Sequence, residues 1–119
     1  MDRPTLGLIE EVELRGPKKR KALQARIDTG AMKSSLDTSL AMELGLGPAH
    51  KERLIKSASG SRLRPIVQAT VVIAGKEITD EFSLADRSHL SYPVLIGQSI
   101  LIKGRFLIDP LKERGRQDG

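Results

Sequence analysis

The sequence predicts an all-β domain, either a barrel or a sandwich, that carries one or two short helices. Short runs rich in valine and isoleucine recur along the chain. Turn signals separate these runs about every 8–12 residues, which is typical of both architectures. The 119 residues suit one domain with one core, because compact domains most often hold roughly 100–150 residues. Aromatic residues make up only 3% of the chain, so we expect an aliphatic core.

We expect a single domain over residues 1–119. Its core should lie between about residues 5 and 110, because the apolar runs fall within these limits. Residues 111–119 are mostly polar, and we expect them to form a flexible tail.

The first two strands follow from alternating apolar positions. Residues 5–14 and residues 23–27 each alternate with the period of two that a half-buried strand requires. One face of the first strand would carry four apolar side chains, namely Leu6, Leu8, Val12 and Leu14.

Residues 37–44 predict a short helix. Asp37 or Thr38 can accept hydrogen bonds from its unpaired N-terminal amides, and Gly45 stands where a glycine commonly ends a helix. The apolar side of this helix would consist of Leu40, Ala41 and Leu44.

Two hairpins are predicted in the middle of the chain. Residues 54–58 and 63–73 would pair around the turn Ser59-Gly60-Ser61, whose small residues allow a tight reversal. Pro65 lacks an amide hydrogen and indicates an edge or a bulge. Gly75-Lys76 would then connect to a strand over residues 77–84.

The last third of the chain predicts three short elements. Residues 92–96 form an almost wholly apolar strand that ends at Gly97. Residues 99–102 would form one helical turn, and residues 105–108 a final strand that stops before Pro110.

The net charge of +5 and the pI near 9.8 favour acidic partners. The densest basic run is Lys18-Lys19-Arg20-Lys21, which a solvated turn explains without any ligand. The alternative is electrostatic steering of an acidic substrate or a nucleic acid. Aromatic stacking residues do not accompany these charges, and no helix-turn-helix or zinc-finger spacing is present. The sequence therefore disfavours a nucleic-acid partner.

Composition also bears on the compartment. No apolar stretch approaches the ~20 residues that a membrane-spanning helix needs, and residues 1–4 lack the apolar segment of a secretory signal. We therefore expect a cytoplasmic protein with no membrane partner. The chain has no cysteine, which excludes disulfides, thiol catalysis and cysteine-based zinc sites but does not decide the compartment.

The segment that carries most chemical information is Asp28-Thr29-Gly30. It follows an apolar strand directly, so the strand delivers a carboxylate to its end. Gly30 allows a close backbone approach that a side chain would block, and the Thr29 hydroxyl can hold the loop. The same three residues alone also suit an ordinary turn.

The wider context resembles the retropepsin family of aspartic peptidases. Asp28-Thr29-Gly30-Ala31, followed by Ser34-Ser35-Leu36, resembles the active-site signature of that family. Val94-Leu95-Ile96-Gly97, followed by Ser99-Ile100-Leu101, resembles its second motif. The resemblance covers about residues 6–109. Residues 25–36 together with residues 92–101 resemble more specifically a prokaryotic branch of the family that is often labelled ATP-dependent zinc protease. It implies the acid-protease fold, in which each single-lobe subunit is a closed β-barrel.

This chemistry requires two carboxylates. One ionised aspartate takes a proton from water while its protonated partner polarises the scissile carbonyl, and the pair shares one proton. The chain has one Asp-Thr-Gly. A hydroxyl-glycine pair follows none of the other aspartates, which are Asp2, Asp37, Asp80, Asp86, Asp109 and Asp118. We therefore expect a homodimer in which Asp28 meets its symmetry mate.

The resemblance also implies roles for other residues. Thr29 and Gly30 would belong to the catalytic loop with Asp28, and Phe106 to Ile108 would contribute to the dimer interface. Substrate would contact five residues. Ser59, Gly60 and Ser61 would form the tip of a mobile flap, and Ala31 and Ile96 would belong to the two motifs. Gln98 is a departure, because retropepsins often carry arginine there.

Metal and nucleotide cofactors find no support in the sequence. His50 and His89 are isolated in predicted loops, unlike the paired histidines of zinc hydrolases. No phosphate-binding Gly-x-x-x-x-Gly-Lys-Ser/Thr loop occurs. Ser34 and Ser35 have no histidine nearby in sequence, so we expect them to hydrogen-bond around the Asp28 loop. We therefore expect neither a metal nor any other cofactor.

The sequence therefore predicts an aspartic endopeptidase that acts as a homodimer on a peptide or protein, with an acidic substrate favoured by the basic surface. The alternative is a non-catalytic β-barrel of the same fold that binds peptides or acidic partners.

Overall fold

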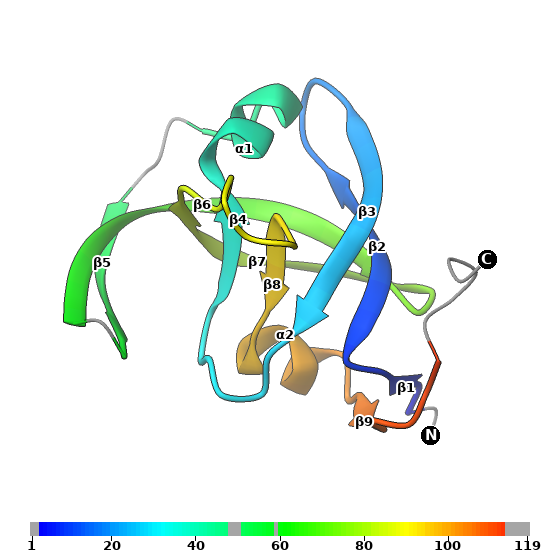
Figure 1. The fold of residues 1–119 in the computed structure, drawn as a ribbon. Helices are drawn as coiled ribbons and strands as arrows, with labels where there is room; N and C mark the ends of the chain where they lie inside the picture. Colours follow the sequence, from blue (N-terminus) through cyan, green and yellow to red (C-terminus); the bar gives the residue numbers. More distant parts are fainter. Residues whose placement is uncertain (1–2, 48–50, 59, 114–119) are drawn as a thin grey trace.

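The computed structural model describes residues 3–47, 51–58 and 60–113, without the side chain of Ser57. Six strands hydrogen-bond in a closed ring, which confirms the predicted barrel (Figure 1). In ring order they are β2 (Ile9–Arg15), β3 (Arg20–Ile27), β8 (Val94–Ile96), β4 (Ser34–Asp37), β7 (Lys76–Ala85) and β6 (Gly60–Ile73), which pairs back with β2.

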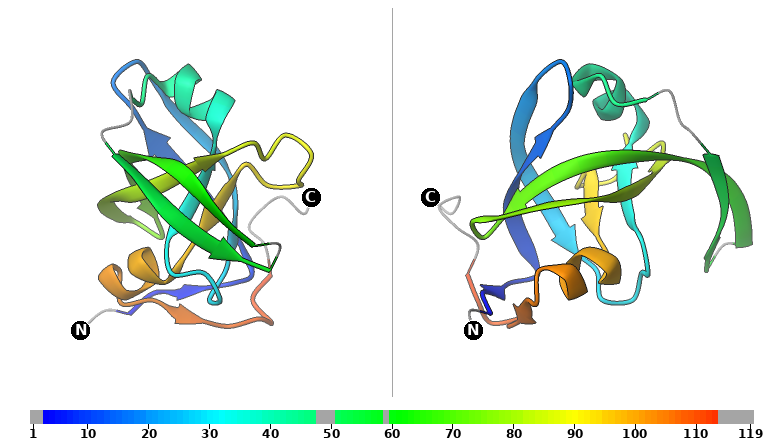
Figure 2. Two further views of the ribbon diagram at one scale, coloured as in Figure 1. Left: turned by 90° about the vertical axis from the view of Figure 1, so that its left-hand side faces the viewer. Right: turned by 180° about the vertical axis from the view of Figure 1, so that it is seen from behind.

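The remaining elements lie outside this ring. β5 (Lys51–Ser57) pairs with the first part of β6, and β1 (Thr5–Leu6) pairs in parallel with β9 (Leu107–Ile108). The two helices are α1 (Thr38–Leu44) and α2 (Gln98–Lys103). They lie at opposite ends of the barrel, α1 beside the β2–β3 turn and α2 beside β1 and β9 (Figures 1 and 2).

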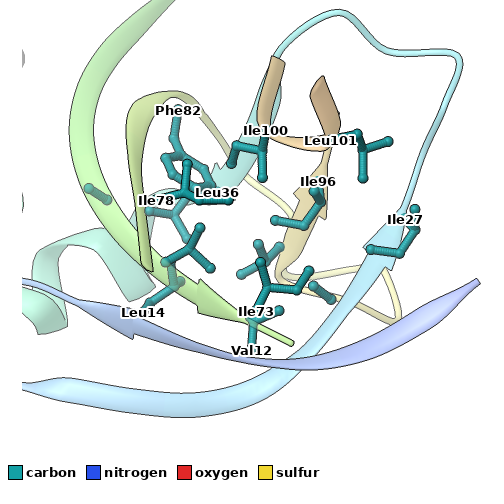
Figure 3. Close-up of a cluster of buried hydrophobic side chains, with 14 of the residues drawn as sticks. Val12, Leu14, Ile27, Leu36, Ile73, Ile78, Phe82, Ile96, Ile100 and Leu101 are labelled. Atoms are coloured by element: carbon teal, nitrogen blue, oxygen red, sulfur yellow. The ribbon is translucent and has the colours of Figure 1, made fainter. Parts of the chain in front are cut away.

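The core is aliphatic, as predicted, with Phe82 and Phe106 as its buried aromatic rings. Alternate residues of each strand point into the barrel, because successive side chains of a strand face opposite sides. Figure 3 shows how side chains from most strands meet α2 in the barrel interior. Ten of them are Val12, Leu14, Ile27, Leu36, Ile73, Ile78, Phe82, Ile96, Ile100 and Leu101.

The predicted first strand is wrong in its continuity. The chain breaks between β1 and β2 at Gly7 and Leu8, and Leu8 is 52% exposed while Ile9 is buried. Gly7 N–H donates to the Glu10 carboxylate at 2.6 Å, which bends the backbone. Leu8 therefore does not join the face predicted for it, whereas Leu6, Val12 and Leu14 are buried as predicted.

Helix α1 confirms its local signals. Asp37 caps it by accepting a hydrogen bond from Leu40 N–H, and the buried side chains are the predicted three. Gly45 ends the helix at φ 79°, a left-handed conformation that glycine adopts without strain.

The β5–β6 hairpin confirms the predicted pairing, but its strands are longer than expected. The pairing runs from Lys51 with Ile66 to Ser57 with Gly60, so Gly60 and Ser61 lie in β6. Ser59 lies outside the described residues. Pro65 pairs with β5 alone, because β7 joins β6 only from Ile66 onward. This confirms its edge position.

The β6–β7 turn lies one residue earlier than predicted. Ile73 pairs with Lys76, so Ala74 and Gly75 form the turn instead of Gly75 and Lys76. Both turn residues have positive φ, at 50° and 78°. This is the geometry that matches the twist of a two-residue hairpin.

The C-terminal segment that the sequence predicts for a dimer interface is paired within the protomer. Phe106 is only 6% exposed and belongs to the core cluster. β9 pairs with β1 of the same chain through Leu107 N–H to Pro4 C=O and Asp109 N–H to Leu6 C=O. The Phe106 ring therefore packs within the protomer, and the contribution of residues 106–108 to a dimer interface stays a prediction. Residues 114–119 of the predicted tail lie outside the described residues.

The basic run covers the end of the β2–β3 turn and the first two residues of β3. Lys19 and Lys21 both contact the Glu43 carboxylate, at 3.2 and 3.3 Å, and all four basic side chains are exposed. This arrangement agrees with a solvated turn.

Within the part of the chain that the structure describes, no helix has the length and apolarity needed to cross a membrane.

Asp37→Ala should lower the free energy of unfolding by about 1–2 kcal/mol at pH 7, the usual effect of losing a helix cap. Besides Leu40 N–H, the carboxylate binds the Ser39 hydroxyl at 2.6 Å and Arg87 N–H at 2.8 Å. The Ser39 hydrogen bond lowers the pKa of Asp37, against the opposing effect of burial, and the amide donors add to the lowering. A lowered pKa means that the stabilisation is present above the unfolded pKa, about 3.9, and is lost as the pH falls through the folded pKa.

Urea unfolding at pH 7 and pH 3 measures this. The difference between wild type and Asp37→Ala should shrink at pH 3. Asp86→Ala is the control, because Asp86 is exposed and its carboxylate bonds Ser88. Equal losses for the two variants at pH 7 would contradict the capping role.

Candidate active site

The parallel pairing of β3 with β8 joins two segments that lie far apart in sequence. Ala25, Arg26 and Ile27 pair with Val94, Leu95 and Ile96 in register. Because the strands are parallel, both carboxyl ends meet at the same edge, and Asp28 N–H donates to Ile96 C=O at 2.9 Å. The structure thus brings together the two motifs that the sequence singled out.

Asp28 is half-buried at this edge. One carboxylate oxygen accepts a hydrogen bond from Gly30 N–H at 2.9 Å, and Ala31 N–H donates to Asp28 C=O at 3.3 Å. A Cβ on residue 30 would lie 3.3 Å from that same carboxylate oxygen, so glycine suits the position. Among the described residues, no second carboxylate contacts Asp28.

The start of α2 is fastened to the Asp28 loop. Gln98 N–H donates to Ala31 C=O at 2.7 Å, and Ser99 N–H donates to Met32 C=O at 3.0 Å. These amides belong to the first helical turn, whose N–H groups have no partner within the helix. The loop therefore supplies the hydrogen bonds that cap α2.

Two side chains complete this junction. The buried Ser34 hydroxyl accepts a hydrogen bond from Gly97 N–H at 2.9 Å, which confirms that Ser34 hydrogen-bonds around the loop. Gln98 Nε2 donates to Thr29 C=O at 2.7 Å. Sequence reasoning noted Gln98 only as a departure from the family and missed this contact, which no local pattern signals.

The residues predicted to contact substrate lie in three different parts of the structure: the Asp28 loop, the core and the β5–β6 hairpin. Ala31 is half-buried beside Asp28. Ile96 corrects a prediction, because its side chain is fully buried in the core and only its carbonyl serves the site. Its neighbour Leu95 is half-buried and points to the opposite face of β8. Gly60 and Ser61 lie at the far end of the β5–β6 hairpin.

The face of the sheet away from the barrel core continues onto this hairpin. Ile66, Ser83, Ser35 and Leu95 are partners in neighbouring strands, so they share one face. We call these four residues the outer sheet face. Ile66 and Ser83 are buried although they point away from the core. By register the same face carries further hairpin side chains, namely Lys51, Arg53, Ile55, Arg62 and Arg64.

Glu81 gathers three cations at the base of the hairpin. Its carboxylate lies 2.6 Å from Lys51 Nζ, 3.0 Å from Arg53 Nη2 and 3.7 Å from Lys33 Nζ. The hydrogen bond from Lys51 lowers the pKa of Glu81, against the opposing effect of burial, and the charges of Arg53 and Lys33 add to the lowering. Since Lys33 closes the Asp28 loop, this cluster connects the hairpin with that loop.

The half-buried Arg87 interacts electrostatically with the negative charge of Asp28. Burial lowers the pKa of Arg87, and the negative charges of Asp37 and Asp28 oppose this lowering. Its Nε donates to Tyr92 C=O at 3.0 Å, which fixes the loop before β8.

The described residues offer no candidate metal site. His89 is exposed, and His50 lies outside the described residues. Over residues 3–47, 51–58 and 60–113, no three histidine or acidic side chains gather closely enough to hold a metal ion.

Comparisons with known proteins identify the fold. Residues 46–118 match the family model described as RimB-like, retropepsin-like aspartic endopeptidase RimB. The matched span lies after Asp28, so it does not test the carboxylate. No curated protein sequence matches the chain.

Three solved structures share the fold. Legionella pneumophila protein Lpg0085, of unknown function, is 19% identical with a TM-score of 0.69, and the match covers 96% of this chain and 98% of that one. EIAV protease, in complex with the inhibitor HBY-793, is 22% identical with a TM-score of 0.64, over 86% and 88% of the two chains. The simian foamy virus protease is 17% identical with a TM-score of 0.54, over 77% and 91%. The predicted acid-protease fold is therefore confirmed.

Ser34→Ala should lower the free energy of unfolding by about 1–3 kcal/mol, because it leaves the buried Gly97 N–H without its acceptor. Ser35→Ala is the matched control at the next position, where the side chain is half-buried on the outer sheet face. Urea unfolding of both variants measures the difference. Equal stability of the two variants would show that the Ser34–Gly97 bond does not hold the junction.

Proposed function

Since the chain belongs to the RimB-like family of retropepsin-like aspartic endopeptidases, we propose that it hydrolyses peptide bonds as a homodimer with Asp28 of each subunit at the shared active site. The observation that carries the proposal is the position of Asp28. Its carboxylate is half-buried at the end of β3, in a loop fastened on both sides to β8 and α2. A catalytic group must be held in this way, because small errors in placement cost large factors in rate.

The chemistry follows from two carboxylates in contact. Two negative charges about 3 Å apart repel so strongly that one proton is shared between them. The ionised member accepts a proton from water, and the protonated member donates a hydrogen bond to the scissile carbonyl. Water then attacks the polarised carbon, and the tetrahedral species collapses as the leaving amine takes up a proton. This route forms no covalent intermediate with the protein.

One subunit supplies half of this arrangement. Among the described residues Asp28 contacts no other carboxylate, and the sequence holds no second Asp-Thr-Gly. A twofold dimer supplies the missing group, because an isologous interface brings the same residue of both subunits to the axis. We propose that Thr29 and Gly30 line this axis with Asp28, and that Ala31 contacts the substrate.

The β5–β6 hairpin is the proposed flap, including Ser59, Gly60 and Ser61. It projects from the barrel on one side (Figures 1 and 2). An extended peptide lying between the flap and the outer sheet face can add main-chain hydrogen bonds to the strands. Closure of the flap would exclude water from the reaction.

The flap charges favour an acidic substrate. Residues 51–66 contain five lysine or arginine residues and one glutamate, a net charge of +4 within a chain of net charge +5. Arg53, Arg62 and Arg64 lie on the flap face that continues the outer sheet face. We therefore propose that glutamate- or aspartate-rich peptides are the substrates.

Asp28→Asn should reduce peptide cleavage by at least about 10³-fold, because general acid–base groups contribute about 10²–10⁴-fold and this change disables the pair at both subunits. The side chain keeps its size and its acceptor for Gly30 N–H. Mass spectrometry of a cleaved peptide library measures the rate, with Asp86→Asn as the control. Equal cleavage by wild type and Asp28→Asn would remove Asp28 from the mechanism. If wild type and Asp28→Asn both bind the peptide and neither cleaves it, the protein is a non-catalytic binding module.

Cleavage of a glutamate-rich peptide should slow as salt increases. Raising the ionic strength from 0.01 M to 0.15 M shortens the Debye length from about 30 Å to about 8 Å, which screens exposed charges. Arg62→Gln with Arg64→Gln should lower kcat/KM for this peptide roughly tenfold, about 1.4 kcal/mol for two partly exposed contacts. Arg20→Gln at the start of β3 is the control. A neutral peptide with the same salt dependence would contradict charge recognition.

A further inference from the structure

One carboxylate joins the flap to the Asp28 loop. Lys51 Nζ and Arg53 Nη2 approach Glu81 from the flap, at 2.6 Å and 3.0 Å. Lys33 Nζ approaches the same carboxylate from the Asp28 loop, at 3.7 Å. Only 18% of the Glu81 side chain is exposed. We call these four residues the flap-base cluster.

The flap leaves the barrel where this cluster lies. Within the described residues, β5 hydrogen-bonds to no strand other than β6, and β7 joins β6 only from Ile66 onward. Lys51, the first residue of β5, pairs with Ile66. The hairpin projects from the barrel beyond this point (Figures 1 and 2). Of the described residues of β5, only Lys51 and Arg53 form ion pairs, and both pair with Glu81.

The Asp28 loop is the fixed side of this connection. Its backbone caps α2 through two amide hydrogen bonds, from Gln98 to Ala31 and from Ser99 to Met32. The next residue, Lys33, packs so closely on the start of α2 that a Cβ on residue 97 would lie 2.5 Å from its carbonyl oxygen. Since the loop is held by its main chain, a change at Glu81 should act mainly on the flap.

The charges of the cluster do not balance. One anion is surrounded by three cations, two from the flap and one from the loop. Without the negative charge of Glu81, the three cations would repel one another and separate the flap from the loop. The lysine and arginine side chains are partly exposed, so each ion pair contributes little to the stability of the whole domain. Local opening costs much less than unfolding, so the same pairs can decide the position of the flap.

We propose that Glu81 is a positioning residue that holds the base of the flap against the Asp28 loop and so sets how often the flap lies in its peptide-binding position. The proposal rests on the proposed function, because that function assigns the flap to substrate. Glu81 acts through Lys33, Lys51 and Arg53 and does not touch the peptide.

Glu81→Gln tests this role, because it keeps the shape of the side chain and removes its charge. KM for a neutral peptide should rise about fivefold to tenfold, because apparent affinity falls with the fraction of molecules whose flap is in the binding position. The value of kcat should change less, since Asp28 is untouched. A neutral peptide excludes direct attraction between substrate and the released cations. Glu81→Asp keeps the charge on a shorter side chain, so its KM should lie between those of wild type and Glu81→Gln.

Hydrogen exchange measured by mass spectrometry reports the flap without relying on cleavage. Amides of residues 51–57 and 60–66 should exchange about fivefold faster in Glu81→Gln, while those of the barrel strands keep their rates. Glu43→Gln is the matched control, because Glu43 holds two cations, Lys19 and Lys21, from α1 at the other end of the barrel. Its flap should exchange like that of wild type. At 1 M salt, where the Debye length is about 3 Å, wild type should approach Glu81→Gln.

The outcomes separate this role from the proposed function. Unchanged flap exchange in Glu81→Gln, with or without a raised KM, overturns the positioning role and leaves the proposed function intact. Faster exchange over the whole barrel, or faster flap exchange with an unchanged KM, also overturns it. If wild type binds the peptide but does not cleave it, a Kd raised in Glu81→Gln together with faster flap exchange supports the role of Glu81 and overturns the proposed function.

Discussion

Parallel hydrogen bonding between β3 and β8 places the ends of two distant segments at one point, and the rest of the site depends on it. Asp28 takes its position from Ile96, α2 starts where β8 ends, and the amides of that first helical turn are satisfied by carbonyls of the Asp28 loop. The loop and the helix therefore cap each other. Since buried polar groups without partners are costly, displacing the loop would leave the first amides of α2 without acceptors.

Signals that act over a few residues were readable from the sequence, and contacts that depend on the closed ring were not. The cap at Asp37, the glycine at Gly45 and the β5–β6 pairing follow from local chemistry and alternation, and all three are confirmed. The burial of Ile96 and the exposure of Leu8 depend on how the strands meet the core of the closed ring, which alternation along one strand does not determine. The Gln98–Thr29 bond joins residues 69 positions apart, so no local pattern contains it.

The carboxylates Asp37 and Glu81 have more partners than the carboxylate of Asp28. Asp37 and Glu81 are held by several donors or cations, and their pKa values are lowered for that reason. Such carboxylates stay ionised and serve as fixed structural anions. Among the described residues, the Asp28 carboxylate has one donor, Gly30 N–H. The protomer thus surrounds Asp37 and Glu81 with partners and leaves the carboxylate at the end of β3 with capacity for more.

In the proposed dimer, that remaining capacity makes subunit association a requirement for catalysis. A carboxylate with four lone-pair sites and one internal donor can accept a proton shared with a second carboxylate without breaking the bonds that hold its loop. The cost of bringing two such groups together falls on the interface, which must bury enough apolar surface to offset their repulsion. Thr29, which adjoins Asp28, is fastened to Gln98 at the start of α2. Contacts of the proposed dimer around Thr29 and the bonds that orient Asp28 would then involve the same few residues, so loosening one would also misplace the other.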